Sequence, residues 1–359
     1  MEDRIQLKTP RFILEGGIFM TLKDLADVIP VSRGTIDRVI HNRGKVSEKS
    51  EKLVLSALKE YGYIPNQTGR ALAAIKKSYK VGVLLFKGED PFNLSIINGI
   101  RQSFEKYKDC GFKLIEELIE DEVLENQKEA LLRLAEEGAD TIIFCPMVSP
   151  LIKDTMRQLA DKGIVIITVN SDIDDDSRLC FVGHNNYQSG RTATSLLSNM
   201  IGNRGNVLIA AGIQEFESHI HRLEGALSFL NKEVPDVKIV GIITDTQEKV
   251  RESIMQTVER QTVHAILILS IYIEEIVTAV EELGLTGKII LGAFDLNDRS
   301  IKYLSENRIN FIIDQSPVLQ GQIAMDIAGE YLINKQKPEK KSNFTKTTII
   351  MKENLSDYI

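Results

Sequence analysis

From Val81 onward, short apolar runs alternate with stretches of helical periodicity, and this alternation restricts the fold more than any other feature. The runs are VGVLLF, FKLIEE, TIIF, IVIITV, NVLIAA, VKIVGII, AILIL, KIILGAF and NFII, and the helical stretches include residues 96–107, 124–137, 151–162, 187–201 and 320–334. Strands that are apolar at nearly every position are typical of parallel sheets covered by helices on both faces. So many strand–helix units predict two doubly wound α/β lobes rather than one sheet.

Composition and motifs narrow the chemistry. The 359 residues are 43% hydrophobic and 26% charged, which is globular, and no apolar run is long enough to cross a bilayer. Cys110, Cys145 and Cys180 are widely spaced, so we expect neither a disulfide framework nor a metal site, and we expect a reducing compartment, the cytoplasm. Because no G-x-G-x-x-G follows a strand and no P-loop or catalytic triad pattern is present, we expect no cofactor and no enzymatic activity.

The net charge of −7 hides a change of sign along the chain. Residues 20–80 carry 12 basic and 6 acidic side chains, a net of +6, whereas residues 81–359 carry 29 basic and 42 acidic ones, a net of −13. A basic head therefore precedes an acidic body, and the head is the part suited to a polyanionic partner.

The first nineteen residues lack the pattern of a signal peptide. Leu14 to Met20 reads LEGGIFM, which a bacterial ribosome-binding site followed by a start codon would encode. Two interpretations stay open: residues 1–19 are a short extension, or translation starts at Met20.

The head has a helix-turn-helix pattern. Thr21 can cap a helix that ends at Ile29-Pro30, and Ser32 can cap a second helix with Ile36 and Val39 on its inner side. A third helix is predicted from Ser47 to Gly62. Three short helices of this kind can share one small core, so we expect an all-α domain over residues 20–65.

The segments TLKDLADVIPVSRGTIDRVIHN and VSEKSEKLVLSALKEYGYIPN resemble the head of the lactose/galactose repressor family of bacterial transcription regulators. The resemblance implies that Ser32 to Ile40 is a recognition helix for the major groove of double-stranded DNA. The DNA-contacting positions it implies are Thr21, Ser32, Thr35 and Asn42 for phosphates, Arg33, Gly34 and Arg38 for bases, and Asn66, Arg70 and Leu72 in the adjoining segment.

Two departures from the family pattern affect this helix. Ile29-Pro30 stands where the family usually has alanine-glycine, and Asp37 where it usually has serine. Since a carboxylate repels phosphate, Asp37 is expected to pair with Arg33 or to accept a hydrogen bond from a cytosine amino group; a solvated helix charge is the alternative. The arginines can each donate two hydrogen bonds to guanine, which discriminates against other bases by about 1–3 kcal/mol.

Residues 66–79 occupy the place of the family's hinge helix. The resemblance implies that two such helices, one per subunit, fold on DNA and that Leu72 wedges between base pairs in the minor groove. Ordinary packing within a linker helix is the alternative for Leu72. Gly69 lowers the helix propensity of the segment by up to about 1 kcal/mol, so we expect its folding to depend on DNA.

Polar and aromatic residues follow the predicted strands, where ligands bind in such sheets. Together with the strand pattern they resemble the periplasmic-binding-protein type I sensor of the same family, in its ribose-type branch. The candidate ligand contacts are Asp90, Phe92, Asn170, Arg222, Ser270, Asp295 and Gln315. The alternatives are core packing for Phe92, a surface salt bridge for Arg222 and a strand-end turn or cap for Asp295. Because Ser270-Ile271 and Asn170-Ser171 replace common family pairs, the ligand is expected to be less polar than ribose or differently shaped.

These observations predict a sugar-responsive regulator, most simply a repressor, that acts as a homodimer on a palindromic operator, with no membrane partner. The expected parts are residues 1–19, the head 20–65, the linker 66–79 and the sensor 80–359. Lobe 1 is expected over about 80–184 and 314–340, and lobe 2 over about 185–313 and 341–359. The alternatives are a transport-type sugar-binding protein, which would lack the head, and an α/β enzyme using Asp295 and Arg222.

Overall fold

The computed structural model describes residues 22–40, 46–60, 77–87, 91–212 and 216–359. The chain divides into two compact units, residues 1–77 and 78–359. Several predicted positions lie outside the described residues: the first nineteen residues, Thr21, Asn42, Asn66, Arg70, Leu72 and Asp90. The predictions for those positions remain predictions.

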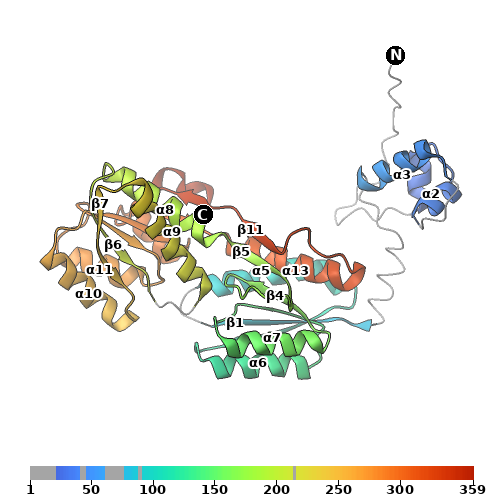
Figure 1. Ribbon diagram of the computed structural model, residues 1–359, viewed down its shortest axis with the longest axis horizontal. Coiled ribbons are helices and arrows are strands. Elements are labelled where there is room, and N and C mark those ends of the chain that lie inside the picture. Colours follow the sequence, from blue (N-terminus) through green and yellow to red (C-terminus); the bar gives the residue numbers. More distant parts are fainter. Residues whose placement is uncertain (1–21, 41–45, 61–76, 88–90, 213–215) are drawn as a thin grey trace, which may run out of the picture. The chain divides into compact units, whose positions relative to one another are not determined.

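The first unit contains the three predicted helices, α1 (Leu22–Val28), α2 (Arg33–Ile40) and α3 (Glu48–Glu60) (Figure 1). Their shared core is formed by Leu25, Ile29, Ile36, Val54 and Ala57, all buried. Ser32 and Ser47 precede α2 and α3, and each serine Oγ accepts a hydrogen bond, at 3.2 Å, from the backbone N–H three residues later. These N-caps explain why both helices begin where the sequence predicts.

The second unit has two lobes, each built on a six-stranded sheet. The sheet of the first lobe has the strand order β11-β5-β4-β3-β1-β2 and is parallel throughout. Its strands are β1 (Lys80–Phe86), β2 (Lys113–Ile119), β3 (Thr141–Phe144), β4 (Val165–Val169), β5 (Arg178–His184) and β11 (Ser342–Thr345). Helices α6 (Leu124–Glu136) and α7 (Pro150–Asp161) cover one face, and α5 (Pro91–Lys108) and α13 (Pro317–Asn334) the other (Figure 1).

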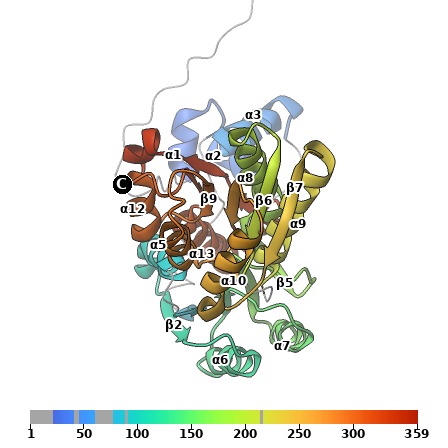
Figure 2. The same cartoon turned by 90° about the vertical axis from the view of Figure 1, so that its left-hand side faces the viewer.

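The sheet of the second lobe has the order β12-β10-β9-β8-β6-β7. Its strands are β6 (Gly205–Ala210), β7 (Val237–Ile243), β8 (Ala265–Ile268), β9 (Ile290–Phe294), β10 (Phe311–Asp314) and β12 (Thr348–Ile350), which alone is antiparallel to its neighbour. Helices α8 (Asn186–Met200) and α9 (Glu217–Glu233) lie together on one face (Figure 2). The other face packs against α10 (Gln247–Arg260), α11 (Ile273–Glu282), α12 (Asp298–Ser305) and the 3₁₀ turn Lys352–Asp357.

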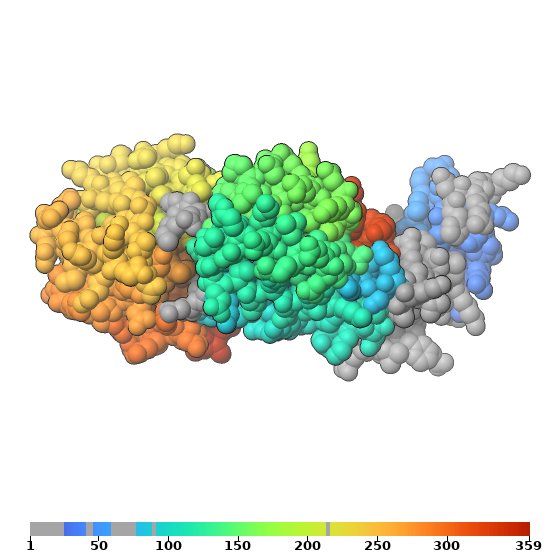
Figure 3. Space-filling view, turned by 90° about the horizontal axis from the view of Figure 1, so that it is seen from below, coloured from blue at the N-terminus to red at the C-terminus, as the bar shows by residue number. Residues whose placement is uncertain are grey.

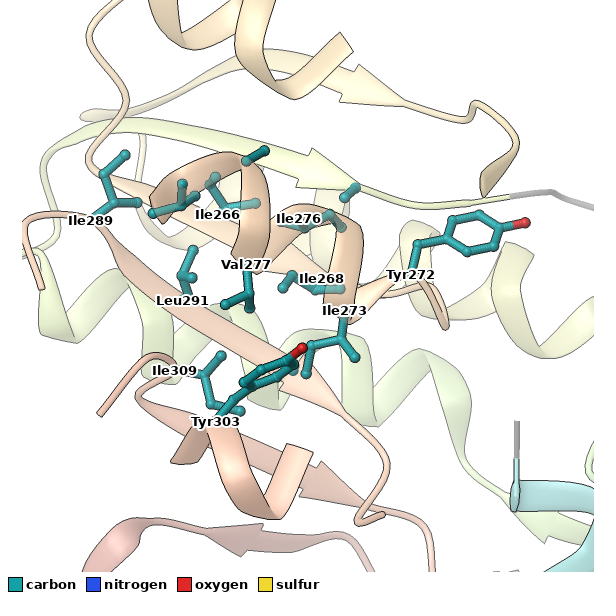
Figure 4. Close-up of a cluster of buried hydrophobic side chains, with 14 of the residues drawn as sticks. Ile266, Ile268, Tyr272, Ile273, Ile276, Val277, Ile289, Leu291, Tyr303 and Ile309 are labelled. Atoms are coloured by element: carbon teal, nitrogen blue, oxygen red, sulfur yellow. The ribbon is translucent and has the colours of Figure 1, made fainter. Parts of the chain in front are cut away.

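The core under α11 is dense with isoleucine and valine (Figure 4). Ile266, Ile268, Ile276 and Val277 are almost fully buried there, between β8 and α11. Tyr272 lies at the edge of this cluster and extends away from the other labelled side chains (Figure 4). The loop that follows β8 is thus held by a rigid core at its base.

The chain passes between the lobes three times, after β5, after β10 and after β11. The lobes form two masses side by side (Figure 3). One expected boundary is wrong: residues 342–345 belong to the first lobe, because Ser342 to Thr345 pair with Phe181 to His184 of β5. The edge of the first sheet beside β5 has room for an added strand, and β11 takes this place. The chain returns to the second lobe only after β11, just before β12.

Each lobe has one helix pair whose backbones nearly touch. A Cβ added to Gly99 of α5 would lie 2.0 Å from the carbonyl oxygen of Val318, and one added to Gly225 of α9 would lie 2.0 Å from that of Tyr187. Only glycine permits this approach of α5 to α13 and of α9 to α8. No helix in the part of the chain that the structure describes is long and apolar enough to cross a membrane.

Candidate functional site

Helix α2 presents one polar face to solvent. Ser32, Arg33, Gly34 and Arg38 are exposed, whereas Ile36 is buried in the head core. A side chain at Gly34 would meet only the Ser32 Oγ, at 3.9 Å, so the surface between the two arginines is open. The helix thus offers two guanidinium groups with free access for a base edge in the major groove.

Two predicted phosphate contacts, Ser32 just before α2 and Thr35 on it, already interact with each other within the head. The hydroxyls of Ser32 and Thr35 lie 3.0 Å apart, and the Thr35 N–H donates to the Ser32 Oγ. Asp37 is half-buried. Its pairing with Arg33 or with a cytosine remains a prediction.

In the second lobe, predicted ligand contacts come together at the carboxyl ends of neighbouring strands. Ser270 follows β8, Asp295 follows β9 and Gln315 follows β10. The Gln315 amide donates to Asp295 Oδ1 at 2.5 Å. Asp295 has a φ of +70°, a left-handed conformation that turns the chain sharply as it leaves the strand.

A cavity of about 230 Å³ opens at these strand ends. Its lining comes from the loops after β8 and β9, the first turns of α10, α11 and α12, and the start of α5: Pro91, Gln247, Ser270, Ile271, Tyr272, Ile273, Glu275, Phe294, Asp295, Asn297, Asp298 and Arg299. Two of the predicted contacts, Ser270 and Asp295, therefore line the cavity. The sequence analysis missed Gln247, Glu275 and Asp298. Asp298 lies only four residues beyond β9, so the expectation that ligand contacts follow the strands could have included it.

The cavity is rich in carboxylates. Glu275, Asp295 and Asp298 line it, against one guanidinium, that of Arg299, which pairs with Glu274 at 3.4 Å. The buried hydroxyl of Ser270 has no hydrogen-bond partner within the described residues. Acceptors and a spare hydroxyl suit a ligand that brings hydroxyl or ammonium donors. No cluster of three or more His, Cys, Asp or Glu side chains in the described ranges is placed to hold a metal ion.

Arg222 lies behind the cavity wall rather than in its lining. It is 3% exposed, which does not match a surface salt bridge. Its guanidinium donates to the Leu269 carbonyl at 2.8 Å and to Asn186 Oδ1 at 3.3 Å, and its carbon lies 4.1 Å from the centre of the Phe294 ring. Arg222 therefore supports two lining segments, the end of β8 and the end of β9.

The first lobe contributes less to the cavity. Phe92 is 7% exposed near the start of α5 and does not line it, although its neighbour Pro91 does. Asn170, with a φ of +65°, turns its amide towards the sulfur of Cys145 at 3.8 Å. The structure thus does not bring Phe92 and Asn170 together with Ser270 and Asp295 around this cavity.

The lobes touch where the segment after β4 and the end of β1 meet the start of α9. The Ser171 Oγ, just after β4, accepts a hydrogen bond from the Glu217 N–H at the start of α9, at 3.1 Å. The rings of Phe86 and Phe216 meet edge to face at 5.4 Å. Burial raises the pKa of the Glu217 carboxyl, whose neighbours are His221, Asp172 and Arg178. Because this contact joins the two lobes, a change in lobe closure would alter it.

The three crossings are tied to one another. His184 Nε2 and the Thr347 hydroxyl are 2.7 Å apart, and the Thr345 hydroxyl donates to the Gln315 carbonyl at 2.9 Å. His184 is 2% exposed, and burial, assisted by the nearby Arg222 charge, lowers its pKa to about 4. A neutral imidazole therefore sits where the chain passes between lobes.

Comparison with known proteins agrees with both units. Residues 81–336 match the model of the periplasmic binding protein domain, and residues 21–66 match that of bacterial regulatory proteins of the lacI family. The chain belongs to the lacI family of bacterial regulatory proteins. This lacI-family member is a DNA-binding regulator of transcription with a sensor domain like that of sugar-binding proteins.

Among its relatives is the HTH-type transcriptional regulator MalR of Staphylococcus xylosus, 22% identical over 257 residues that cover 70% of this chain and 73% of MalR. GalR of Escherichia coli is 36% identical over 149 residues, 41% of each chain. The structure of a putative LacI regulator from Bacteroides fragilis superposes with a TM-score of 0.71 at 21% identity, covering 79% of this chain and all of that one. A solute-binding protein from Actinobacillus succinogenes with bound D-allose also has a TM-score of 0.71, at 24% identity, covering 78% of this chain and all of that one. These superpositions show the fold of the lacI-family sensor.

Proposed function

We propose that this regulator represses transcription as a homodimer on a palindromic operator, and that a small carbohydrate-like effector bound between the lobes controls its affinity for DNA. The observation that carries the proposal is the cavity lined by Ser270 and Asp295, in a chain whose head also exposes a cationic recognition helix. Repression and its control by the effector would both take place in the cytoplasm. Each consists of binding, to DNA or to the effector, and neither requires catalysis.

The readout of DNA is assigned to α2. Arg33 and Arg38 would read guanines, and Gly34 would let the helix lie close to the base edges. Thr21, Ser32, Thr35, Asn42, Asn66 and Arg70 would hold phosphates or the adjoining backbone, and Leu72 would wedge into the minor groove. Two copies related by two-fold symmetry would read two half-sites.

The effector is proposed to be a neutral or cationic polyol, such as a simple sugar or an amino sugar. Glu275, Asp295 and Asp298 would accept hydrogen bonds from hydroxyl or ammonium groups, and Phe294 and Tyr272 supply apolar surface for C–H faces. A phosphate or carboxylate on the effector would meet three carboxylates and one already paired guanidinium. At 4 Å and an effective dielectric constant of 20, two like charges repel by about 4 kcal/mol.

Control of DNA binding would follow from closure. Because the cavity is lined by the second lobe and by Pro91 of the first, an effector that contacts both sides favours one arrangement of the lobes. It can shift operator affinity only by the ratio of its affinities for the two arrangements. Arg222 and Gln315 would act as positioning residues, because they fix Phe294 and Asp295.

The test is a thermal-shift screen of the full chain against neutral sugars, amino sugars and sugar phosphates. We expect a neutral or amino sugar to raise the melting temperature of the wild type and of Asp154→Asn, a variant of an exposed aspartate on α7. Asp295→Asn and Ser270→Ala should each reduce the affinity about tenfold, the loss of roughly one good hydrogen bond. Unchanged affinity in both cavity variants would remove the cavity from the proposal.

DNA binding is tested separately by gel shift with an operator selected from random sequence. Arg33→Ala and Arg38→Ala should each relax base preference at one position of the half-site, by about 1–3 kcal/mol. The logarithm of the affinity should fall linearly with the logarithm of the salt concentration, because phosphate contacts release counterions. A flat salt dependence would contradict the assignment of the head as the DNA-binding site.

A further inference from the structure

A second, larger hollow lies in the first lobe, away from the effector cavity. Its volume is about 530 Å³. It is lined at the amino ends of β4 and β5 by Ile164 and Arg178, at the end of α13 by Tyr331, and in the segment that leads into β11 by Lys337, Lys340 and Lys341. Because β4 and β5 are parallel, this edge of the sheet is opposite to the edge that faces the effector cavity. We refer to it as the lysine groove.

The charge of the lysine groove has the opposite sign to that of the effector cavity. Three lysines line it with one carboxylate, Asp176, which forms an ion pair with Lys341 at 2.5 Å. Within the described residues, the ammonium groups of Lys337 and Lys340 form no ion pair. Both side chains are exposed. This cationic surface stands on a body whose net charge is −13 over residues 81–359.

Buried donors complete the lysine groove. The Arg178 side chain is 3% exposed and lines it; its Nη2 pairs with Asp172 and Asp174, and its Nη1 donates to the Lys341 carbonyl at 3.3 Å. The Nε–H of Arg178 is buried without an acceptor in the described part of the chain. A buried polar group is normally satisfied, so this N–H points to an acceptor that the protein itself does not supply.

The walls of the lysine groove are suited to more than a bare ion. Tyr331 offers an aromatic ring, with the Lys335 ammonium 5.2 Å from its centre, and Ile164 and Pro338 supply apolar surface. A ligand with an anionic end and a ring or apolar body could place its charge at the lysines and its body against Tyr331. A volume of about 530 Å³ is sufficient for a ligand the size of a phosphorylated sugar.

We propose that the lysine groove is a second ligand site, which binds a small phosphomonoester. Lys337 and Lys340 would neutralise the dianion, and the Arg178 Nε–H would donate to one of its oxygens. The two sites would divide ligands by charge, since the effector cavity repels the anions that the lysine groove attracts. The proposal stands on residues of the first lobe alone and does not depend on what the effector cavity binds.

A ligand bound in the lysine groove would also affect the segments in which the chain crosses between the lobes. The segment of Lys337 to Lys341 continues directly into β11, whose last residue, Thr345, bonds to the carbonyls of Gln315 and Gly183. A phosphomonoester that fixes this segment also fixes the amino end of a strand that leads to the third crossing. It therefore acts on the same chain segments that must turn when the lobes close.

The test uses the full chain, with glucose 6-phosphate and inorganic phosphate as probes, in thermal shift and titration calorimetry. We expect glucose 6-phosphate to stabilise the wild type, and the double variant Lys337→Ala/Lys340→Ala to bind it at least tenfold more weakly. The matched control is Lys232→Ala/Lys238→Ala, which removes two exposed lysines of the second lobe and leaves the affinity unchanged. Glucose serves as the uncharged reference and should not distinguish the two double variants.

Three results would overturn the proposal. The first is no stabilisation of the wild type by either phosphate probe. The second is an equal loss of affinity in both double variants, which would show a general charge effect. The third is loss of phosphate binding in Asp295→Asn but not in the lysine-groove variant, which would place the anion in the effector cavity. In the first case, weaker DNA binding by the lysine-groove variant would show that the lysines contact DNA phosphates instead.

Discussion

The two lobes of the sensor have the same architecture, yet the polar residues at the carboxyl ends of their strands have different surroundings. Each has six strands, helices on both faces and one helix pair in backbone contact. In the second lobe Ser270 and Asp295, which follow β8 and β9, line a cavity. In the first lobe the loop after β4 is closed by Asp172, which bonds to Thr168 at 2.6 Å and to Arg178 at 2.8 Å.

This difference shows that the same strand-end position can recognise a ligand or stabilise a lobe. Polar groups that satisfy one another, as Asp172 and Thr168 do, have little capacity left for a ligand at that position. Polar groups that are held from behind, as Asp295 is by Gln315, keep acceptor capacity on the cavity side. The second lobe therefore carries recognition at this edge, and the first lobe carries a rigid surface against which it closes.

The two buried arginines provide the largest test of this comparison. Arg178→Met should lower the free energy of unfolding by about 3–5 kcal/mol, because it leaves the buried Asp172 carboxylate without its partner. Arg222→Met should cost about 2–3 kcal/mol, since it removes a hydrogen bond to the Leu269 carbonyl and a stacking contact with Phe294. Urea unfolding followed by circular dichroism measures both.

Ligand binding separates the two arginine variants further. Arg222→Met should also weaken sugar binding, because Phe294 lines the cavity, whereas Arg178→Met should leave sugar binding near the wild-type value. Arg251→Met, on the exposed face of α10 with the exposed partner Glu282, is the control and should change stability by less than about 1 kcal/mol. Equal effects of Arg178→Met and Arg222→Met on sugar affinity would refute the division between the lobes.

The histidine at the first crossing predicts a pH dependence of intermediate size. The pKa of His184 is about 4 in the folded chain and about 6.5 when unfolded, so the unfolded chain binds more protons between these values. The contribution of the neutral His184 to the free energy of unfolding is fully present above pH 6.5 and is lost as the pH falls towards 4. Between pH 7 and pH 5 the loss is about 2 kcal/mol.

His184→Gln should remove this part of the acid sensitivity while keeping a side chain that can bond to Thr347. Denaturant unfolding at pH 7 and pH 5 measures the difference between variant and wild type. The neighbouring charged group is Arg222, which reinforces the effect of burial. Parallel losses of stability in the two proteins would mean that the imidazole is not the group that titrates.

The smallest effect is expected at the contact between the lobes. Ser171→Ala removes the acceptor for the Glu217 N–H, a cap worth about 1 kcal/mol, and should weaken effector binding about fivefold if the effector-bound form keeps this contact. Ser149→Ala is a matched control, because Ser149 caps α7 by accepting from the Ile152 N–H within one lobe. It should lower stability similarly without changing effector affinity in calorimetry.

Much of the fold was predictable from hydrophobic pattern alone. The runs TIIF and VKIVGII coincide with β3 and β7, because both strands are apolar at nearly every position, which leaves a clear signal in the sequence. The strands β5, β11 and β12 were missed. β5 begins with the buried Arg178, and β11 and β12 are short edge strands whose sequences, SNFT and TII, are brief or polar. Their positions depend on pairing with distant strands, which no local pattern records.

The site was predictable only where chemistry follows a strand directly. Ser270 and Asp295 were found on that rule and line the cavity. Arg222 and Gln315 were assigned as contacts, but the structure places them behind the wall, a difference that requires knowledge of side-chain direction. Gln247 and Glu275 were missed, because polar residues in a first helical turn look like ordinary helix starts; in the structure they bond to each other at 2.7 Å.

The three crossings also have a consequence for how the chain is made. On the ribosome, residues 186–314 emerge as one continuous piece that contains every strand of the second sheet except β12. The first lobe begins earlier, yet its sheet and helix layer stay incomplete until after that piece, since α5 packs on α13 and β5 pairs with β11. During synthesis the face of α5 around Gly99 therefore stays uncovered until α13 has emerged, after five of the six strands of the second sheet have been made.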